Sequence, residues 1–380
     1  MKKGNMSLII LILGIMVLFS TISSVDATIV KELGTSNVDY KDMVKINNDK
    51  APNFIKASKY LKSAKYSKTK GFEKRKNILK TKYGKKYIFI TKYFLPMSWK
   101  NGGKNGKTEY WYNCQSVVIN GKYMYLLTSS GYGMNKGFVI RYDRNILDKY
   151  NGKSLVKLRK LGAAMRDGKK LTKSQKSLKK AIKIGPKFIV GHGQSLTYNP
   201  KTKSLWMWQD NAKNSNNLKL MKINKKTLKP SIIYKFKVKN TEKYFKQFHN
   251  LAFDRYGNFY TDKIVKTKKN PNGYICIFSG RLNHNKIKMK LLTIIKKRPG
   301  IYSQSLAINN KNKRLYLVSD GAIYSIPMVK LLNGNLKESD FYYTLFKTKR
   351  EFESISFDKY GKAYLLILRG TEILKSNQIY

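Results

Sequence analysis

The sequence predicts an all-β protein, a five-bladed β-propeller with an N-terminal basic leader and a small helical insert. One strand–turn–strand pattern occurs five times along the chain. Successive copies begin roughly 50 to 80 residues apart, and multi-stranded repeats of about this length are typical of propeller blades. The repeated region also has one spare strand at its start and too few strands at its end, as a closed ring requires. A β-sandwich, or an irregular β protein that repeats a hairpin, is the alternative.

Each copy of the repeat begins with a polar residue followed by Ser or Asn. An alternating apolar run comes next, then a turn built on Asn or Asp, then a second run rich in Tyr, Trp and Leu. Alternation with a period of two indicates strands, and the turn residues indicate tight connections. Two further strand candidates follow in each interval, which gives four strands to a blade. The copies begin at Gln115-Ser116, Gln194-Ser195, His249-Asn250, Gln304-Ser305 and Glu353-Ser354.

The two ends of the repeated region predict how the ring closes. The run KYIFITKYF, residues 86–94, is strand-like and precedes the first copy, whereas the chain after Ser354 has room for only three strands. Pairing the first run with the last blade would complete that blade and remove an open sheet edge. The predicted propeller domain therefore spans residues 86–380.

The N-terminus predicts export. Lys2 and Lys3 precede an apolar run of about a dozen residues, Leu8 to Phe19, and small residues follow up to Ala27, which is the pattern of a secretory signal peptide. A membrane span needs about 20 apolar residues, so an uncleaved anchor is the less favoured alternative. We assign residues 1–27 to the signal peptide. Residues 28–85 are lysine-rich and weakly periodic, which predicts a basic leader or tether with at most one short helix.

Residues 151–187 interrupt the blade pattern and predict the helical insert. Thr172 and Gln175 have the spacing of a capping box, and Gly185-Pro186 supplies a stop. The apolar side of this helix packs on its own domain or, alternatively, lies on a membrane surface. That side consists of Leu178, Ala181 and Ile182, and the candidate envelope-binding lysines opposite it are Lys176, Lys179, Lys180 and Lys183.

The charge predicts a polyanionic partner. The chain holds 78 Lys+Arg against 21 Asp+Glu, a formal net charge of +57, and such a surface attracts polyanions. An exported protein meets teichoic acid, anionic membrane surfaces and acidic polysaccharide. Lysine outnumbers arginine, which suits diffuse attraction better than bidentate recognition, so we expect no specific nucleic-acid partner. A highly solvated surface adapted to an acidic medium is the alternative.

The inventory of reactive residues argues against catalysis. The chain contains three histidines and none of the HExxH, GxSxG, P-loop, CxxC or dinucleotide-binding motifs. Asp254 and Asp358 lie between paired strands and are interpreted as turn residues. Cys114 and Cys276 permit one disulfide, but their apolar surroundings favour two buried thiols. We therefore expect no catalytic residues, no metal and no cofactor, with a secreted propeller lyase or hydrolase as a weaker alternative.

A ring of polar residues forms the candidate binding site. In a propeller the inner strands begin beside a central channel, so the first residues of the five copies should meet at one mouth. Such a ring could bind a carbohydrate or a metal, or could hold only water. Three of the four tryptophans lie in EYWYN and LWMWQD, which are interpreted as core rather than as sugar-stacking platforms. The predicted mouth residues are Gln115, His192, Gln194, His249, Gln304 and Glu353.

The segments GHGQSLTYNP, LWMWQD and FESISFDKYGKAYLLI resemble the helveticin J-like class III bacteriocins of lactobacilli, over roughly residues 110–380. The resemblance implies a large, heat-labile exported protein that kills or inhibits related bacteria, and it implies no catalytic residues. We therefore expect a secreted cationic antibacterial protein that adsorbs to the anionic envelope of Gram-positive cells. The alternative is a non-lethal adhesin or lectin-like propeller, held on the wall of the producing cell by the same charge.

Overall fold

The computed structural model describes residues 27–39, 45–51, 75–100, 108–111, 113–129, 135–151, 156–210, 215–241, 243–283, 285–300 and 302–380. Nearly all of the predicted signal peptide, residues 1–26, lies outside this part of the chain. Among the described residues, no helix combines the length and the apolar character that a membrane crossing requires.

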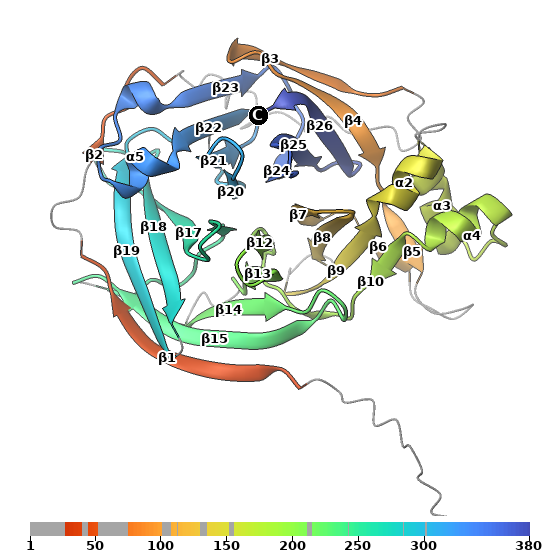
Figure 1. Cartoon of the computed structure of the whole chain (residues 1–380), viewed down its shortest axis with the longest axis horizontal. Coiled ribbons are helices and arrows are strands. Elements are labelled where there is room, and N and C mark those ends of the chain that lie inside the picture. Colours follow the sequence, from red (N-terminus) through yellow and green to blue (C-terminus); the bar gives the residue numbers. More distant parts are fainter. Residues whose placement is uncertain are drawn as a thin grey trace, which may run out of the picture.

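The described chain forms a nearly closed, propeller-like ring of β-sheets (Figure 1). Antiparallel sheets radiate from a central axis, and the first strand of each sheet is the innermost. Short inner strands follow from the sequence, because each copy of the repeat reaches its Asn- or Asp-initiated turn after only a few alternating residues. The inner strands are β7 (Cys114–Asn120), β12 (Thr197–Asn199), β16 (Ala252–Phe253), β20 (Ser305–Asn309) and β24 (Phe352–Phe357).

Each inner strand is followed outward by three more antiparallel strands. The second strands are β8 (Tyr123–Ser129), β13 (Ser204–Trp208), β17 (Phe259–Val265), β21 (Arg314–Ser319) and β25 (Lys362–Ile367). The third strands are β9 (Lys136–Asp143), β14 (Leu218–Ile223), β18 (Tyr274–Asn283), β22 (Ala322–Pro327) and β26 (Glu372–Ile379). The fourth strands are β10 (Ile182–Ile184), β15 (Pro230–Lys239), β19 (Lys286–Ile295), β23 (Tyr342–Phe346) and β4 (Ile88–Phe94).

The predicted closure of the ring is confirmed. Strand β4 pairs antiparallel with β26, with Phe94 opposite Glu372 and Ile90 opposite Lys375. The N-terminal run therefore supplies the outer strand of the last sheet. Strand β3 (Ile78–Gly84) pairs with both β23 and β4 and joins the last two sheets into one of nine strands.

The prediction of a tether over residues 28–85 is wrong for the described parts of that range, which are strands of the ring. Strand β1 (Ile29–Asn37) pairs in parallel with β15, and β2 (Lys45–Ile46) pairs in parallel with β19. Leu33 and Ile46 are buried in the hydrophobic clusters of the adjoining sheets. The segment looks like a tether in sequence because β1 covers the sheet edge and leaves most of its side chains exposed.

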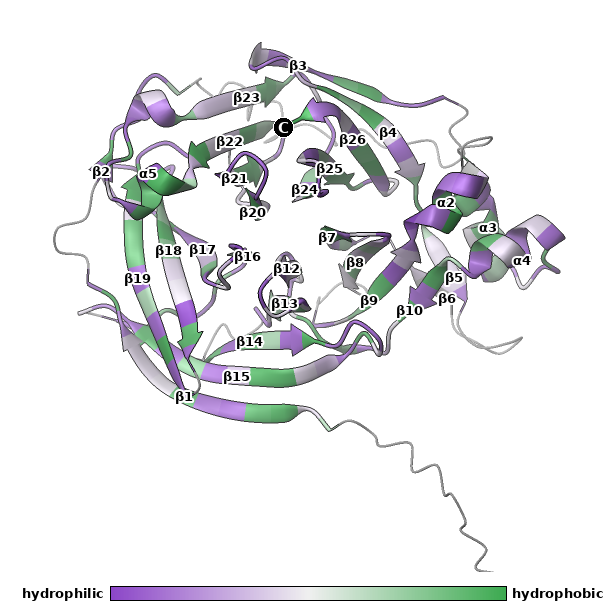
Figure 2. Ribbon diagram, in the orientation of Figure 1, coloured by the Kyte–Doolittle hydropathy of each residue, from purple (hydrophilic) through white to green (hydrophobic). Residues whose placement is uncertain are grey.

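The helical insert packs on its own domain, as the favoured interpretation predicts. The helical part begins earlier than the predicted residue 151, with α2 (Arg144–Asn151), and continues with α3 (Lys157–Arg166) and α4 (Lys173–Lys179). Ile182, predicted on the apolar side of the helix, lies in β10 instead. Thr172 and Gln175 form the predicted capping box. Leu178 and Ala181 are buried in a cluster with residues of the first sheet, although α4 ends before Ala181. Figure 2 shows that α2 and α4 consist largely of hydrophilic residues, whereas the strands carry most of the hydrophobic residues.

The core lies between neighbouring sheets, in five clusters of buried apolar side chains. Trp111, Trp206 and Trp208 belong to these clusters, which confirms their interpretation as core residues. Cys114 and Cys276 are both free and buried. The remaining described elements are short: β5 (Ser98–Lys100) pairs with β6 (Thr108–Tyr110), β11 (Phe188–Ile189) pairs with β9, and α5 (Met328–Leu332) and a single 3-10 turn (Glu338–Asp340) precede β23.

Candidate functional site

The polar mouth is the end of the ring at which the inner strands begin, and we define it by Gln115, His192, Gln194, His249, Gln304 and Glu353. The prediction that distant residues converge there is confirmed for the central three. Gln194 Nε2 donates a hydrogen bond to Gln304 Oε1 at 2.5 Å and lies 3.5 Å from Glu353 Oε2. All three side chains are buried. Gln115 is also buried, but it donates to Asn113 Oδ1 rather than to the other mouth residues.

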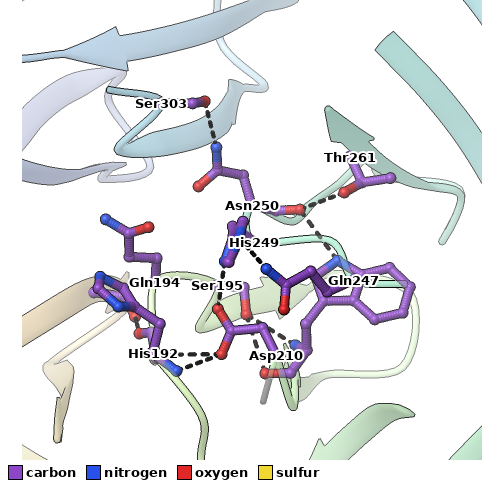
Figure 3. Close-up of polar contacts among 12 residues, drawn as sticks. His192, Gln194, Ser195, Asp210, Gln247, His249, Asn250, Thr261 and Ser303 are labelled. Atoms are coloured by element: carbon purple, nitrogen blue, oxygen red, sulfur yellow. Dashed lines mark hydrogen bonds and ion pairs between the residues drawn. The ribbon is translucent and has the colours of Figure 1, made fainter. Parts of the chain in front are cut away.

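The two histidines of the mouth are joined through Asp210, a residue that sequence reasoning missed (Figure 3). Asp210 Oδ1 accepts the backbone N–H of His192 at 2.5 Å, and Asp210 Oδ2 lies 2.7 Å from His249 Nδ1. The Asp210 side chain is fully buried, whereas that of His249 is 38% exposed. The carboxylate therefore fixes both the loop before β12 and the ring of His249.

Glycine makes this loop possible. Gly191 and Gly193 have φ angles of 70° and 87°, in the left-handed region that glycine adopts without steric cost. A Cβ atom at Gly191 would lie 2.2 Å from Asp210 Oδ1. The Gly-His-Gly sequence, with an acid just after the second strand of the hairpin that follows it, was the signal that could have identified Asp210.

His249 has a partner at each ring nitrogen, which limits its chemistry. Nδ1 faces the carboxylate of Asp210, which accepts hydrogen bonds when it is charged. His249 Nε2 lies 2.9 Å from Gln247 Nε2. An Asp–His pair is the orienting unit of many general bases, but here the second ring nitrogen already has a partner within the protein. The geometry therefore positions His249 for binding more directly than for proton transfer.

A second buried carboxylate ties neighbouring sheets together at the mouth. Asn250 Nδ2 donates to Asp262 Oδ1 at 2.9 Å and to Ser303 Oγ at 2.7 Å, while Ser303 Oγ donates to Asp262 Oδ2 at 2.7 Å. Asn250 precedes β16 and Ser303 precedes β20, so the cluster joins two adjacent sheets. Burial raises the pKa of Asp262, and its two hydrogen bonds act in the opposite direction.

The centre of the mouth favours uncharged side chains. Burial raises the pKa of Glu353 well above its usual value, and the nearby carboxylates of Glu351 and Asp320 add to the effect. The hydrogen bond from Gln194 opposes the rise only in part. Burial also lowers the pKa of His192, against the attraction of Asp210. The mouth therefore presents amides, imidazoles and a carboxyl group that holds its proton more tightly than an exposed one.

Three amide oxygens of the mouth have no hydrogen-bond partner within the described chain. Gln115 Oε1, Gln247 Oε1 and Asn250 Oδ1 are all buried. A buried acceptor without a partner costs about 1–3 kcal/mol, so such atoms require a water or a ligand donor. The described residues contain no group of three or more His, Cys, Asp or Glu side chains arranged to hold a metal ion.

Behind the mouth a small channel runs along the inner strands. It encloses about 90 Å³ and is lined by residues such as Val117, Leu251 and Ile355, from Gln194 at the polar mouth to Pro200 and Asn310 beyond. Liquid water occupies about 30 Å³ per molecule, so the channel holds a few waters and no sugar ring. Any larger ligand must lie outside it, at one of its two ends.

The candidate envelope-binding lysines do not belong to this mouth. Helix α4 lies at the outer rim of the ring in Figure 1, away from the inner strands. The four candidates, Lys176, Lys179, Lys180 and Lys183, are all exposed to solvent. Only Lys176 and Lys179 lie on α4, because Lys180 is its C-cap and Lys183 lies in β10, so the prediction that one helix carries all four is wrong.

Comparison with known proteins identifies no family. No family model matches the chain, and no curated protein matches it. Among solved structures, a glucose dehydrogenase is 13% identical, with a TM-score of 0.39, over 82% of this chain and 99% of its own. The soluble aldose sugar dehydrogenase of Escherichia coli is 12% identical, with a TM-score of 0.38, over 81% and 97%. A putative 6-phosphogluconolactonase of Bacteroides uniformis is 8% identical, with a TM-score of 0.31, over 80% and 82%. We transfer no residue role from them.

Proposed function

We propose that the protein is a secreted cationic antibacterial protein that adsorbs to the anionic envelope of Gram-positive cells. The observation that carries the proposal is the separation of the two charge types. The acidic side chains are few, and many of them are used inside the ring, as Asp210, Asp262 and Glu353 are. The lysines are distributed over exposed positions of nearly every turn and outer strand. The excess of positive charge therefore faces solvent, where a polyanion can reach it.

The polar mouth supplies a second and more specific contact in this proposal. The half-exposed ring of His249 is the part of the mouth that an envelope component can contact. A charge-driven adsorption step would concentrate the protein at the cell, and the mouth would then engage one component of the envelope.

The test is to add the purified mature protein to a panel of Gram-positive strains and to score binding and viability separately. Binding together with loss of viability supports the proposal. Binding to every strain without loss of viability supports the non-lethal adhesin or lectin-like alternative, which relies on the same charge.

The weaker alternative, a secreted lyase or hydrolase, is favoured by one observation, the contact between Asp210 and His249. Its test is incubation with purified wall polymers and with acidic polysaccharide, followed by assay for new reducing ends, new double bonds or released phosphate. A signal that disappears in a His249→Gln variant would replace the binding proposal with an enzymatic one.

We also propose that the ring consists of five blades. The five inner strands begin within three residues of the start of the predicted repeats, and each of them leads a four-stranded antiparallel unit. The join between β3 and β4 is then a contact between two blades rather than part of a larger sheet. A crystal structure with a different number of four-stranded units around the axis would overturn this count.

A further inference from the structure

The end of the ring opposite the polar mouth carries a group of basic side chains. Every inner strand begins at the mouth, so the turn that follows it lies at the far end of the ring. These five turns cover residues 121–122, 200–203, 254–258, 310–313 and 358–361. Each of them contains at least one cation. We call this set the basic turn ring: Lys122, Lys201, Lys203, Arg255, Lys311, Lys313 and Lys359.

The turns of the ring are built so that their cations face solvent. In four of them an Asn or Asp at the start accepts backbone N–H groups of the turn. Asn199 Oδ1 accepts from Lys201 and Thr202, at 3.0 and 3.2 Å, and Asp254 Oδ1 accepts from Tyr256 at 2.9 Å. Asn309 and Asp358 act in the same way. The second oxygen of Asp254 accepts from Asn258 and Tyr260, and that of Asp358 lies 3.5 Å from Lys375 Nζ, so both aspartates are engaged within the protein. The exposed side chains of the turns are mainly basic.

Backbone strain marks two of these lysines. Lys203 and Lys313 have φ angles of 50° and 57°, in the left-handed region that side chains other than glycine rarely adopt. The corresponding positions in two other copies are Gly257 and Gly361, with φ angles of 84° and 79°. Glycine would fit all four positions without steric cost. A residue that keeps an unfavourable backbone conformation is a candidate for function.

Two pairs of neighbouring turns touch. A Cβ atom at Gly257 would lie 2.9 Å from Lys201 Cδ, and one at Gly361 would lie 2.8 Å from Lys311 Cβ. Each of these lysines thus lies across the turn of the next copy. The turn residues Pro200 and Asn310 also line the channel. Two turns of the basic turn ring therefore contribute to the end of the channel that faces away from the polar mouth.

Two of the turns pair an exposed tyrosine with a cation. Tyr256 and Tyr360 are 60% and 62% exposed. The Arg255 guanidinium lies 4.7 Å from the centre of the Tyr256 ring, and the Lys359 ammonium lies 4.9 Å from that of Tyr360. A flat ring beside a cation can contact a polyol or sugar while the cation contacts phosphate.

We propose that the basic turn ring is the site that binds a linear phosphate polymer with hydroxyl-bearing repeat units. This inference rests on the proposed adsorption to anionic envelopes and gives that adsorption a location. Lysines suit the isolated charges of phosphodiesters, because an ammonium group acts as a point charge. A membrane surface fits less well, since the turns contain no Leu, Ile, Val, Met or Phe that could enter a bilayer.

The test compares two variants that each remove four positive charges. The ring variant is Lys201→Gln, Lys203→Gly, Lys311→Gln and Lys313→Gly, in which glycine relieves the two left-handed positions. The control variant is Lys266→Gln, Lys268→Gln, Lys347→Gln and Lys349→Gln, in the connections at the mouth end of the ring. All four control lysines are exposed. Binding to poly(glycerol phosphate) is measured for the full mature protein and both variants at low salt.

The ring variant should bind the polymer about tenfold more weakly or worse, if each cation contributes as much as an exposed ion pair. The control variant should stay within about threefold of the parent protein, since only diffuse attraction changes. Equal loss in both variants would overturn the ring as the site while leaving adsorption intact. A parent protein that does not bind the polymer would instead contradict the proposed function itself.

Vesicles of anionic lipid and single-stranded DNA are measured in parallel. If the ring variant loses more of its binding to vesicles or DNA than of its binding to the polymer, the assignment to a phosphate polymer is overturned. Circular dichroism and urea unfolding verify that both variants are folded. We expect the ring variant to fold, because its two glycine substitutions remove backbone strain.

Discussion

Replacement of Glu353 by glutamine should make the protein more stable at neutral pH. Glu353 is buried at the polar mouth, and the group that donates to it is the neutral amide of Gln194, 3.5 Å away. Burial raises its pKa well above the usual value, and Glu351 and Asp320 raise it further. Glutamine has nearly the same shape and carries no charge at any pH, so the substitution removes only the cost of ionisation.

The sign and the size of the effect follow from proton linkage. A carboxyl group with a raised pKa in the folded state contributes stability below its unfolded pKa and loses that contribution as the pH rises through the folded pKa. Glu353→Gln and the parent should therefore have equal free energies of unfolding near pH 4. Toward pH 8 the variant should become more stable, by about 1.4 kcal/mol for each unit by which folding raises the pKa.

Urea unfolding at a series of pH values measures this difference, and Glu372→Gln is the matched control. Glu372 is equally buried, but Arg350 Nη2 lies 2.9 Å from its Oε2 and Thr91 and Asn77 donate to it. Removal of that charge leaves a mostly buried arginine without its partner and should cost about 3 kcal/mol at neutral pH. A Glu353→Gln variant that is less stable than the parent at pH 8, or whose difference does not change with pH, would refute the reasoning.

Three further predictions concern the outer strand, the strained turns and the polar mouth. Leu33→Ala should lower the free energy of unfolding by about 2–5 kcal/mol, because Leu33 is buried where β1 meets the ring. An unchanged free energy of unfolding in a urea titration would show that the segment is a tether after all. Lys203→Gly alone should raise the free energy of unfolding by up to about 1 kcal/mol, since it relieves a left-handed residue, and a clear loss of stability would show that Lys203 makes a structural contact. Simultaneous replacement of Gln194, His249 and Glu353 should abolish antibacterial activity in a growth-inhibition assay but leave adsorption and folding unchanged. An active triple variant would show that the polar mouth is only a hydrated scaffold.

The repeated part of the fold could be predicted because its signals are local and occur in every copy. Alternation places Val117 and Ile119 on one face of β7, and an Asn or Asp side chain caps the turn after four of the five inner strands. The strand over residues 86–94 was identifiable as the missing outer strand because the last copy runs out of chain. The convergence of Gln194, Gln304 and Glu353 then follows from the geometry of the ring.

The N-terminal strands could not be predicted in the same way. Strand β1 covers a sheet edge with one face in solvent, so only Leu33 and Ser36 of its nine residues are buried and the alternation is too weak to detect. Its partner, β15, is some 200 residues away, and the pairing is parallel.

The role of Asp210 was also hidden. Its partners are two backbone N–H groups and one imidazole, and contacts to backbone leave no motif in a sequence. The basic turn ring was hidden for a related reason. Its lysines are unremarkable among 78 basic residues until the fold brings the five turns to one end of the ring.

The central claim is that positive charge directs the protein to anionic wall polymers, and one measurement tests it most directly. The mature protein is mixed with Gram-positive cells, with and without their teichoic acid, and the bound fraction is measured from low salt to about 0.5 M, where the screening length falls to a few ångström. We predict strong binding that weakens steeply with salt and is mostly lost from cells without teichoic acid. Binding that depends neither on salt nor on teichoic acid would contradict the account.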